Sequence, residues 1–238
     1  MTRTEIKAEV EKLRGGLVVS CQAAKGSPLC DPQIIAALAL TAEQHGAVGV
    51  RINSAEHVAA TKLRVGVPII GIEKVVTPKS DVYITPTFEA ASRIAASGAS
   101  IIAVDATLRP RPQGEQLKDL IRRIHKELRL PVMADVATYD EGSYAAKCGA
   151  DIVATTLCGY TAESRKERLP ALNLVEQMAI DFPVPIICEG GVSSPRQVRY
   201  AFAYGAFAVV VGTAITSIGH LVEQFAAATP VSKSKAKI

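Results

Sequence analysis

The sequence predicts a single α/β domain, a (β/α)8 TIM barrel in which eight parallel strands alternate with helices. Three observations favour this class. The 238 residues contain eight short apolar runs, stretches with helical spacing separate most of these runs, and the later runs take two forms that alternate strictly. A barrel of this length commonly forms one domain. An open, flavodoxin-like sheet is the main alternative, but it needs only about five strands.

The eight predicted strands coincide with the apolar runs. The first run, "GGLVVSCQ", is residues 15–22, and of the later runs four contain a Gly-Ala pair and three have proline at their second position. These seven runs are residues 45–52, 67–74, 97–107, 130–138, 148–157, 184–191 and 204–215. They are apolar throughout rather than alternating, which is typical of parallel strands covered by helices. The repeat of two units favours closure into a barrel.

Helical stretches occupy most of the chain between these strands. Residues 1–16 are charged and helical in pattern, so we expect no signal peptide there. Asp31 and Pro32 form an N-cap and first-position pair at the start of the next helix. The eight helices that follow strands are expected at 31–45, 54–64, 87–97, 114–128, 139–148, 171–180, 194–204 and 217–228. The barrel with its N-terminal helix therefore spans 1–228, and we expect 229–238 to form a basic, flexible tail.

The composition excludes several classes of partner. The net charge is +4, but three lysines lie in the tail, which leaves about +1 for the body. We see no basic face with interleaved aromatic residues, so we expect no nucleic-acid partner. No apolar run reaches the roughly 18 residues that span a bilayer, so we expect no membrane partner. Five cysteines without CxxC spacing indicate reduced thiols in a cytoplasmic protein. Ala-rich helix faces make a homodimer one expectation.

Polar residues gather where the predicted strands end. Because active sites of (β/α)8 barrels lie at the C-terminal ends of the strands, we expect these residues to surround one site. They are Ser20, Gln22, Arg51, Asn53, Lys74, Asp105, Asp135, Thr156, Glu189, Gly212 and Thr213. Three acids and a lysine among about eight strand ends exceed what loop chemistry alone requires. For Asp105 and Asp135, pairing with an arginine is as good an interpretation as catalysis, and "TLRPRP" supplies two arginines near Asp105.

Two glycine-containing loops indicate a phosphate site. The segment "EGGVSSP" at 189–195 joins the seventh predicted strand to a helix start, and "GTAITS" at 212–217 follows the eighth strand. Loops at these two positions commonly bind phosphate through backbone N–H groups and a helix N-terminus. The candidate phosphate-binding residues are Gly190, Gly191, Gly212 and Thr213.

Lys74 admits three interpretations, namely a solvated lysine, a Schiff-base lysine or a general acid or base. As a base it requires a pKa lowered from about 10.4 toward about 7–8. Partial burial and a neighbouring cation, for which Arg51 is the candidate, lower a lysine pKa in this way. Glu189 follows a strand on the opposite side of an eight-stranded barrel, so we expect the two groups to face each other. Glu73 is a candidate partner that would raise the pKa of Lys74 instead.

The sequence predicts no metal and no cofactor. None of the four histidines lies at the C-terminal end of a predicted strand, so a His-based metal centre is not expected at the site. No GxGxxG follows the first strand, which weakens a dinucleotide-binding interpretation.

Nine motifs resemble, in order, those of the N-acetylmannosamine-6-phosphate 2-epimerases over residues 15–220. They are "GLVVSCQA", "GAVGVRINS", "PIIGIEK", "SDVYITPT", "IIAVDATLRPRP", "MADVAT", "ATTLCGYT", "CEGGVSSP" and "VVVGTAIT". The resemblance implies a metal-free barrel enzyme of sialic-acid catabolism with a sugar-phosphate substrate. It implies that Lys74 and Glu189 are catalytic, and that Gln22, Arg51 and Asp135 contact substrate. Tyr160 matches the tyrosine of "GYT".

We therefore predict an epimerase that interconverts N-acetylmannosamine 6-phosphate and N-acetylglucosamine 6-phosphate by proton removal and return at C2. Lys74 and Glu189 are the predicted catalytic residues. The predicted substrate-binding residues are Gln22, Arg51, Asn53, Asp135, Thr156 and Tyr160. Two alternatives stay open from the residues alone: a Schiff-base aldolase that acts on a phosphorylated sugar, and a non-catalytic phosphosugar-binding protein.

Overall fold

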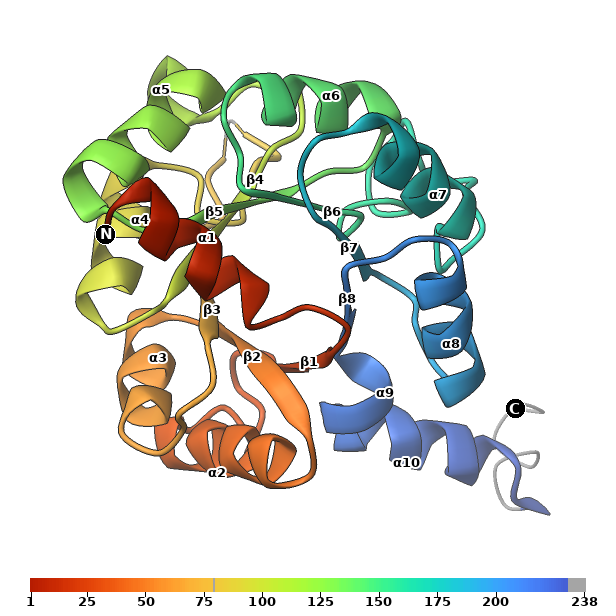
Figure 1. Ribbon diagram of the computed structural model, residues 1–238. Coiled ribbons are helices and arrows are strands. Elements are labelled where there is room, and N and C mark those ends of the chain that lie inside the picture. The colour runs from red at the N-terminus through yellow and green to blue at the C-terminus, as the bar shows by residue number, and fades with distance from the viewer. Residues whose placement is uncertain (79, 231–238) are drawn as a thin grey trace.

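Eight parallel strands close into a barrel in chain order, and β8 pairs with β1 (Figure 1). The computed structural model describes residues 1–78 and 80–230. The strands are β1 (Leu17–Cys21), β2 (Ala47–Asn53), β3 (Ile69–Ile72), β4 (Ile101–Asp105), β5 (Val132–Asp135), β6 (Ile152–Ala154), β7 (Ile186–Glu189) and β8 (Ala208–Val211). The predicted (β/α)8 class is confirmed, and each strand lies inside its predicted apolar run except that β2 extends one residue further.

Helices surround the barrel, and α1 lies across its N-terminal end (Figure 1). The α-helices are α1 (Arg3–Glu11), α2 (Pro32–Gln44), α3 (Ala55–Lys62), α4 (Phe88–Ala96), α5 (Leu117–Arg123), α6 (Tyr139–Lys147), α7 (Leu172–Asp181), α8 (Pro195–Ala203), α9 (Thr213–Thr216) and α10 (Ile218–Ala227). A 3-10 turn, η1 (Pro112–Gly114), precedes α5, and a π-helical turn, η2 (Ile124–Leu128), continues it. None of the helices in the described part of the chain has the length and hydropathy that a bilayer crossing requires.

The strands do not alternate between apolar and polar residues, because both faces of the sheet are buried. Ile101 and Ala103 of β4 belong to the cluster that fills the barrel, while Ile102 and Val104 belong to the cluster between the sheet and the helices. In β3 the outward position is Gly71, where a Cβ would lie 2.4 Å from the Ile94 side chain of α4. The missing side chain therefore lets α4 pack closely against the barrel.

Capping side chains fix where several helices begin, and so where the preceding loops turn. Asp31 Oδ1 accepts hydrogen bonds from the N–H groups of Gln33 (2.8 Å) and Ile34 (3.1 Å), with Pro32 in the first helical turn. Thr138 and Glu141 form a reciprocal capping box at α6. These contacts satisfy N–H groups that have no partner inside their own helix, and the first of them confirms the predicted cap.

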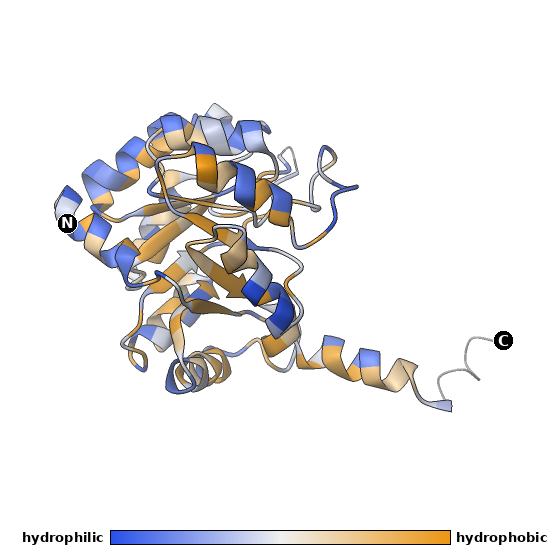
Figure 2. Ribbon diagram, turned by 45° about the vertical axis from the view of Figure 1, so that its right-hand side comes forward, coloured by the Kyte–Doolittle hydropathy of each residue, from blue (hydrophilic) through white to orange (hydrophobic). Residues whose placement is uncertain are grey.

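The end of the chain differs from the expected pattern. The predicted helix at 217–228 forms as α10, but no residue of α10 is buried and the helix projects from the barrel (Figure 2). The short helix α9 packs against β1 in its place. Of the predicted tail, residues 229 and 230 are described and 231–238 lie outside the described residues, so the tail stays a prediction.

Candidate active site

The strand ends surround a single cavity of about 610 Å³. Ten of the twelve predicted site residues line it: Gln22, Arg51, Lys74, Thr156, Tyr160, Glu189, Gly190, Gly191, Gly212 and Thr213. The two others, Asn53 and Asp135, lie beside the cavity and contact residues that line it. The sequence therefore predicted the location of the candidate site, while the roles of its residues stay predictions.

Arg51 binds two carboxylates at the floor of the cavity. Its side chain is 1% exposed, and Nη1 and Nη2 donate to the two carboxylate oxygens of Asp135, at 3.0 and 2.6 Å. Nη1 also donates to Glu189 Oε2 at 2.7 Å. The hydroxyl of Thr156 donates to Asp135 Oδ1 at 2.6 Å and lies 3.2 Å from Glu189 Oε2. One fully buried cation thus faces two carboxylates whose positions it fixes.

The barrel geometry brings these side chains together. The neighbours of Arg51 in β2, Val50 and Ile52, belong to the apolar layer between sheet and helices. Because side chains alternate along a strand, Arg51 points into the barrel. Asp135 ends β5 and Glu189 ends β7, so their carboxylates reach the same level of the interior.

Burial and the neighbouring charges together raise the pKa of Glu189. Burial is the largest effect and raises the pKa of Glu189, and the charge of Asp135 raises it further. Arg51, the Thr156 hydroxyl and Lys74 oppose this rise, and the resulting pKa of Glu189 is about 7. A buried carboxylate loses hydration, and Arg51, the cation that hydrogen-bonds to Glu189, is also paired with Asp135. Glu189 can therefore gain or lose a proton near neutral pH.

The pKa of Lys74 is shifted in the opposite direction, downward. Burial lowers the pKa of Lys74 from its usual value, and the neighbouring Arg51 charge lowers it further, while Glu189 and Asp135 oppose the change. Lys74 keeps exposed surface and lines the cavity, so a ligand can reach its amine. Both causes expected from the sequence, partial burial and the Arg51 cation, therefore act on Lys74.

The expected pairing of Glu73 with Lys74 is wrong. The Glu73 carboxylate instead accepts from Arg93 Nε at 3.0 Å. Consecutive residues in extended backbone point to opposite sides, so Glu73 reaches α4 while Lys74 reaches the cavity. Glu73 therefore does not raise the pKa of Lys74 through an ion pair.

Asn53 holds the backbone of Lys74. Its Oδ1 accepts a hydrogen bond from the Lys74 N–H at 2.9 Å, and Lys74 also forms an antiparallel bridge with Ile84. Asn53 was predicted to bind substrate, but in this structure its side-chain oxygen is bonded to the chain that carries the amine. A fixed backbone limits the positions that the amine can take.

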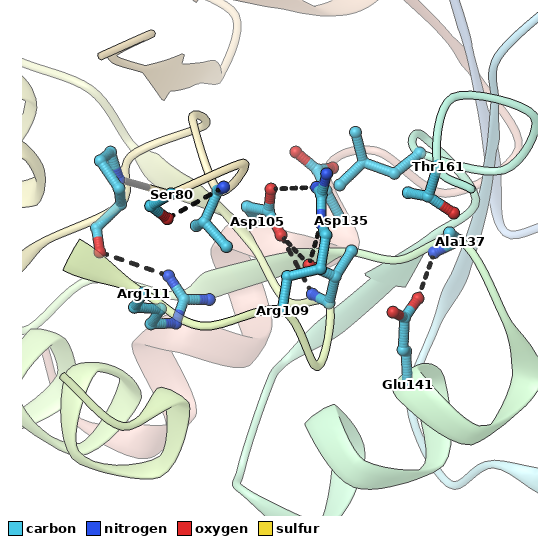
Figure 3. Close-up of polar contacts among 12 residues, drawn as sticks. Ser80, Asp105, Arg109, Arg111, Asp135, Ala137, Glu141 and Thr161 are labelled. Carbon is cyan, nitrogen blue, oxygen red and sulfur yellow. Dashed lines mark hydrogen bonds and ion pairs between the residues drawn. The ribbon is translucent and has the colours of Figure 1, made fainter. Parts of the chain in front are cut away.

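Asp105 pairs with an arginine, one of the two interpretations that the sequence left open. Asp105 is the register partner of Asp135 across β4 and β5, and the two lie side by side (Figure 3). Its carboxylate binds Arg109 at 2.8 Å and the Thr107 hydroxyl at 2.7 Å. Asp105 does not line the cavity.

Two loops form one wall of the cavity. Gly190 and Gly191 have φ values of +104° and +69°, which favour glycine over any other residue. A Cβ at Gly191 would also lie 2.4 Å from Leu169. After β8, Gly212 is the N-cap of α9 and Thr213 is its first residue. The predicted phosphate-binding residues therefore lie together on one side of the cavity.

Several residues that line the cavity are absent from the predicted site. Tyr83 lies in the loop after β3, within the "SDVYITPT" motif, to which the sequence assigned no role. Ser20 was predicted only as a strand end, and its Oγ accepts from Gln22 Nε2 at 2.7 Å. Three residues of α10 also line the cavity, and no pattern in the sequence indicated this: His220, Leu221 and Gln224.

Two buried polar atoms at the site have no hydrogen-bond partner among the described residues. They are Gln22 Oε1, an acceptor, and Arg51 Nε, a donor. Buried polar atoms without partners are costly, so a ligand that pairs with them gains affinity. Within residues 1–78 and 80–230, no group of three or more His, Cys, Asp or Glu side chains has an arrangement that could hold a metal ion.

Comparison with known proteins gives consistent matches. A family model described as "Putative N-acetylmannosamine-6-phosphate epimerase" matches residues 35–231. A protein from Synechococcus elongatus named "Putative N-acetylmannosamine-6-phosphate 2-epimerase" is 50% identical over 222 residues, which cover 92% of this chain and 96% of that protein. The structure of the N-acetylmannosamine-6-phosphate 2-epimerase from Clostridium perfringens matches with a TM-score of 0.88 and 36% identity, and covers 91% of this chain and 94% of that one.

We expect Arg51→Met to lower the free energy of unfolding by about 3 kcal/mol at pH 8, because Asp135 stays buried without its cation. The loss should be smaller at pH 5, where buried carboxyl groups can take up a proton. Urea denaturation at both pH values measures it. Arg64→Met, which removes an exposed arginine bonded to Gln33, is the control. Equal stability of Arg51→Met and the wild type at pH 8 would contradict the structural role of Arg51.

Proposed function

Because the chain belongs to the N-acetylmannosamine-6-phosphate epimerase family, we propose that it interconverts N-acetylmannosamine 6-phosphate and N-acetylglucosamine 6-phosphate in amino-sugar catabolism. One observation supports the proposal most strongly. An amine with a lowered pKa and a carboxyl group with a raised pKa, Lys74 and Glu189, line one cavity beside two glycine-containing loops. Such an amine and such a carboxyl group supply the base and the acid that proton transfer at a sugar carbon requires.

The substrate binds with its phosphate at the two loops. Backbone N–H groups of Gly190, Gly191 and Gly212 face the 6-phosphate, as does the N-terminus of α9 at Thr213. Gln22 Oε1, which has no partner among the described residues, accepts the N–H of the acetamido group. Tyr160, which is 62% exposed, contacts the sugar from the rim of the cavity.

Glu189 opens the sugar ring. In its protonated form the carboxyl group donates its proton to the ring oxygen, and its other oxygen accepts the proton of the 1-hydroxyl. The bond between C1 and the ring oxygen breaks, an aldehyde forms at C1, and the carboxyl group ends with one proton as it began. The aldehyde makes the proton on C2 acidic.

Lys74 in its neutral form then removes the C2 proton. The electron pair of that bond moves into an enolate whose negative charge develops on the C1 oxygen. Arg51 stabilises this charge, because its buried guanidinium lines the cavity and its Nε–H is unpartnered among the described residues. Return of a proton to the opposite face of C2 inverts that carbon, and the ring closes again.

We assign the protein to the cytoplasm. All five cysteines, which lie among the described residues, are free thiols, as expected in a reducing compartment. Family membership favours the epimerase over the Schiff-base aldolase and the binding protein that the residues alone left open.

We expect Lys74→Ala to lower kcat for N-acetylmannosamine 6-phosphate by roughly 10²–10⁴-fold, because the base that removes the C2 proton is lost. An assay in deuterated water tests the chemistry directly, since the wild type should place deuterium at C2 of the product. Lys126→Ala, an exposed lysine in η2, is the control and should keep full activity. Full turnover by Lys74→Ala would exclude the assigned base, and product without deuterium would exclude proton exchange with solvent.

In a plot of log(kcat/KM) against pH, the slope should decrease near pH 7, which we call the bend. Below that pH, kcat/KM rises as Lys74 loses its proton. Above it, Glu189, with its pKa of about 7, loses the protonated form that opens the ring, so the two changes offset each other and the curve levels. In Glu189→Gln the bend near pH 7 should vanish, with a lower rate throughout. A wild-type profile that rises unchanged through pH 7 would contradict the assigned ionisation of Glu189.

A further inference from the structure

Helix α10 presents two polar side chains to the cavity, close to the loop that follows β8. His220 and Gln224 are one helical turn apart, so they share one face of the helix. Both line the cavity, as do Gly212 and Thr213 of that loop. The short helix α9, which begins at Thr213, packs against β1 on one side and against α10 on the other. The first turn of α10 therefore places an imidazole beside the wall at which, in the proposed function, the phosphate binds.

The phosphate of the substrate brings a charge that the arginine and lysine of the cavity are not free to balance. A phosphate monoester carries about −1.5 to −2 at pH 7. Among the described residues, Arg51 and Lys74 are the only arginine and lysine that line the cavity. Arg51 is paired with two carboxylates at the floor. Lys74 is neutral when it acts as the proposed base, so neither cation is committed to the phosphate.

The backbone of the loop after β8 supplies only part of a phosphate site. Helix α9 has four residues, so few peptide dipoles add up at its N-terminus. Two of its N–H groups, those of Ile215 and Thr216, already donate to the Gly212 carbonyl at 2.9 Å. A side-chain donor beside this turn would add the charge and the hydrogen bond that the short helix cannot provide.

We propose that His220 binds the 6-phosphate of the substrate and so determines the preference for phosphorylated over unphosphorylated sugars. The inference rests on the proposed function for the identity of the sugar. A neutral imidazole donates one hydrogen bond, while a charged imidazole donates two and adds an ion pair. Both forms can therefore bind a phosphate oxygen. The side chain of His220 is exposed, so a ligand in the cavity can reach it.

Gln224 orients the ring of His220. The Nε2 atoms of the two side chains are 3.0 Å apart. An amide nitrogen only donates, so the ring nitrogen accepts this bond and a neutral ring carries its proton on Nδ1. When the ring is charged, the amide can turn its oxygen toward the Nε2–H instead. In both states the Nδ1–H of His220 is left for a phosphate oxygen.

Equilibrium binding tests the proposal without turnover. In a Lys74→Ala background, which removes the proposed base, titration calorimetry measures the affinities for N-acetylglucosamine 6-phosphate and N-acetylglucosamine. His220→Ala should weaken binding of the phosphorylated sugar roughly 10-fold, because a hydrogen bond to a charged group is lost, and should leave binding of the unphosphorylated sugar unchanged. His220→Arg should restore most of the affinity, since a guanidinium also donates to phosphate. His45→Ala, which removes an exposed histidine bonded to the Thr41 carbonyl, is the matched control.

Kinetics in the wild-type background provide a second readout. The phosphate is remote from C2, so its contacts act equally on the bound substrate and on the transition state. His220→Ala should therefore raise KM for N-acetylmannosamine 6-phosphate by about the same factor as it weakens binding, with kcat nearly unchanged. A fall in kcat without a change in KM would overturn the assigned role. So would an unchanged affinity of His220→Ala for the phosphorylated sugar, or equal losses for both sugars.

Inorganic phosphate separates this proposal from the proposed reaction. In NMR spectra of the imidazole nitrogens of the full chain at constant pH, added phosphate should shift the signals of His220, which are identified by their absence in His220→Ala. The signals of His45 should stay in place. Unshifted His220 signals would overturn the proposal. A shift in a protein that does not convert N-acetylmannosamine 6-phosphate would support the phosphate contact and contradict the epimerase instead.

Discussion

The double hydrogen bond between Arg51 and Asp135 is the contact on which the site depends. It is made inside the barrel, between β2 and β5, by side chains that are almost fully shielded from water. A buried arginine and a buried carboxylate are each costly alone, so the pair holds both strand ends in a fixed relation. Because the guanidinium is committed to Asp135, Glu189 receives only one hydrogen bond from it, at 2.7 Å. The unequal sharing leaves Glu189 close to its titration point while Arg51 stays charged.

In the proposed function, residues of the cavity serve three tasks. The floor of the cavity carries the charges that shift the two pKa values. One wall, formed by the loops after β7 and β8, offers backbone N–H groups at positions where glycine permits close approach. The loop after β3 carries Lys74, whose backbone Asn53 and Ile84 hold in place. In the proposed function β7 serves more than one of these tasks, because Glu189 ends the strand and the candidate anion-binding residues Gly190 and Gly191 follow it.

The sequence predicted the fold well because both of its signals are local. The repeated Gly-Ala and X-Pro strand starts show where strands begin, and continuous apolar character indicates that both faces are covered. The strand-end rule, the two glycine-containing loops and the family resemblance together named twelve site residues, ten of which line one cavity. It could not reveal that Asn53 bonds to the Lys74 backbone or that Glu73 turns to Arg93, because those contacts depend on which way each side chain points. The projection of α10 also escaped prediction, since an amphipathic pattern shows that a helix has an apolar face without showing how the helix lies against the barrel.

A measurement of the pKa of Glu189 is the most direct test of the role proposed for the Arg51–Asp135–Glu189 contacts. Carbon-13 labelling of glutamate carboxyl groups and an NMR titration of the ligand-free protein report it, and the signal is identified by its absence in Glu189→Gln. The account predicts a pKa of about 7, because burial and Asp135 outweigh the single hydrogen bond from Arg51. A value at or below 4.5, the ordinary value for this group, would mean that Arg51 neutralises both carboxylates and that the proposed chemistry of the site is wrong.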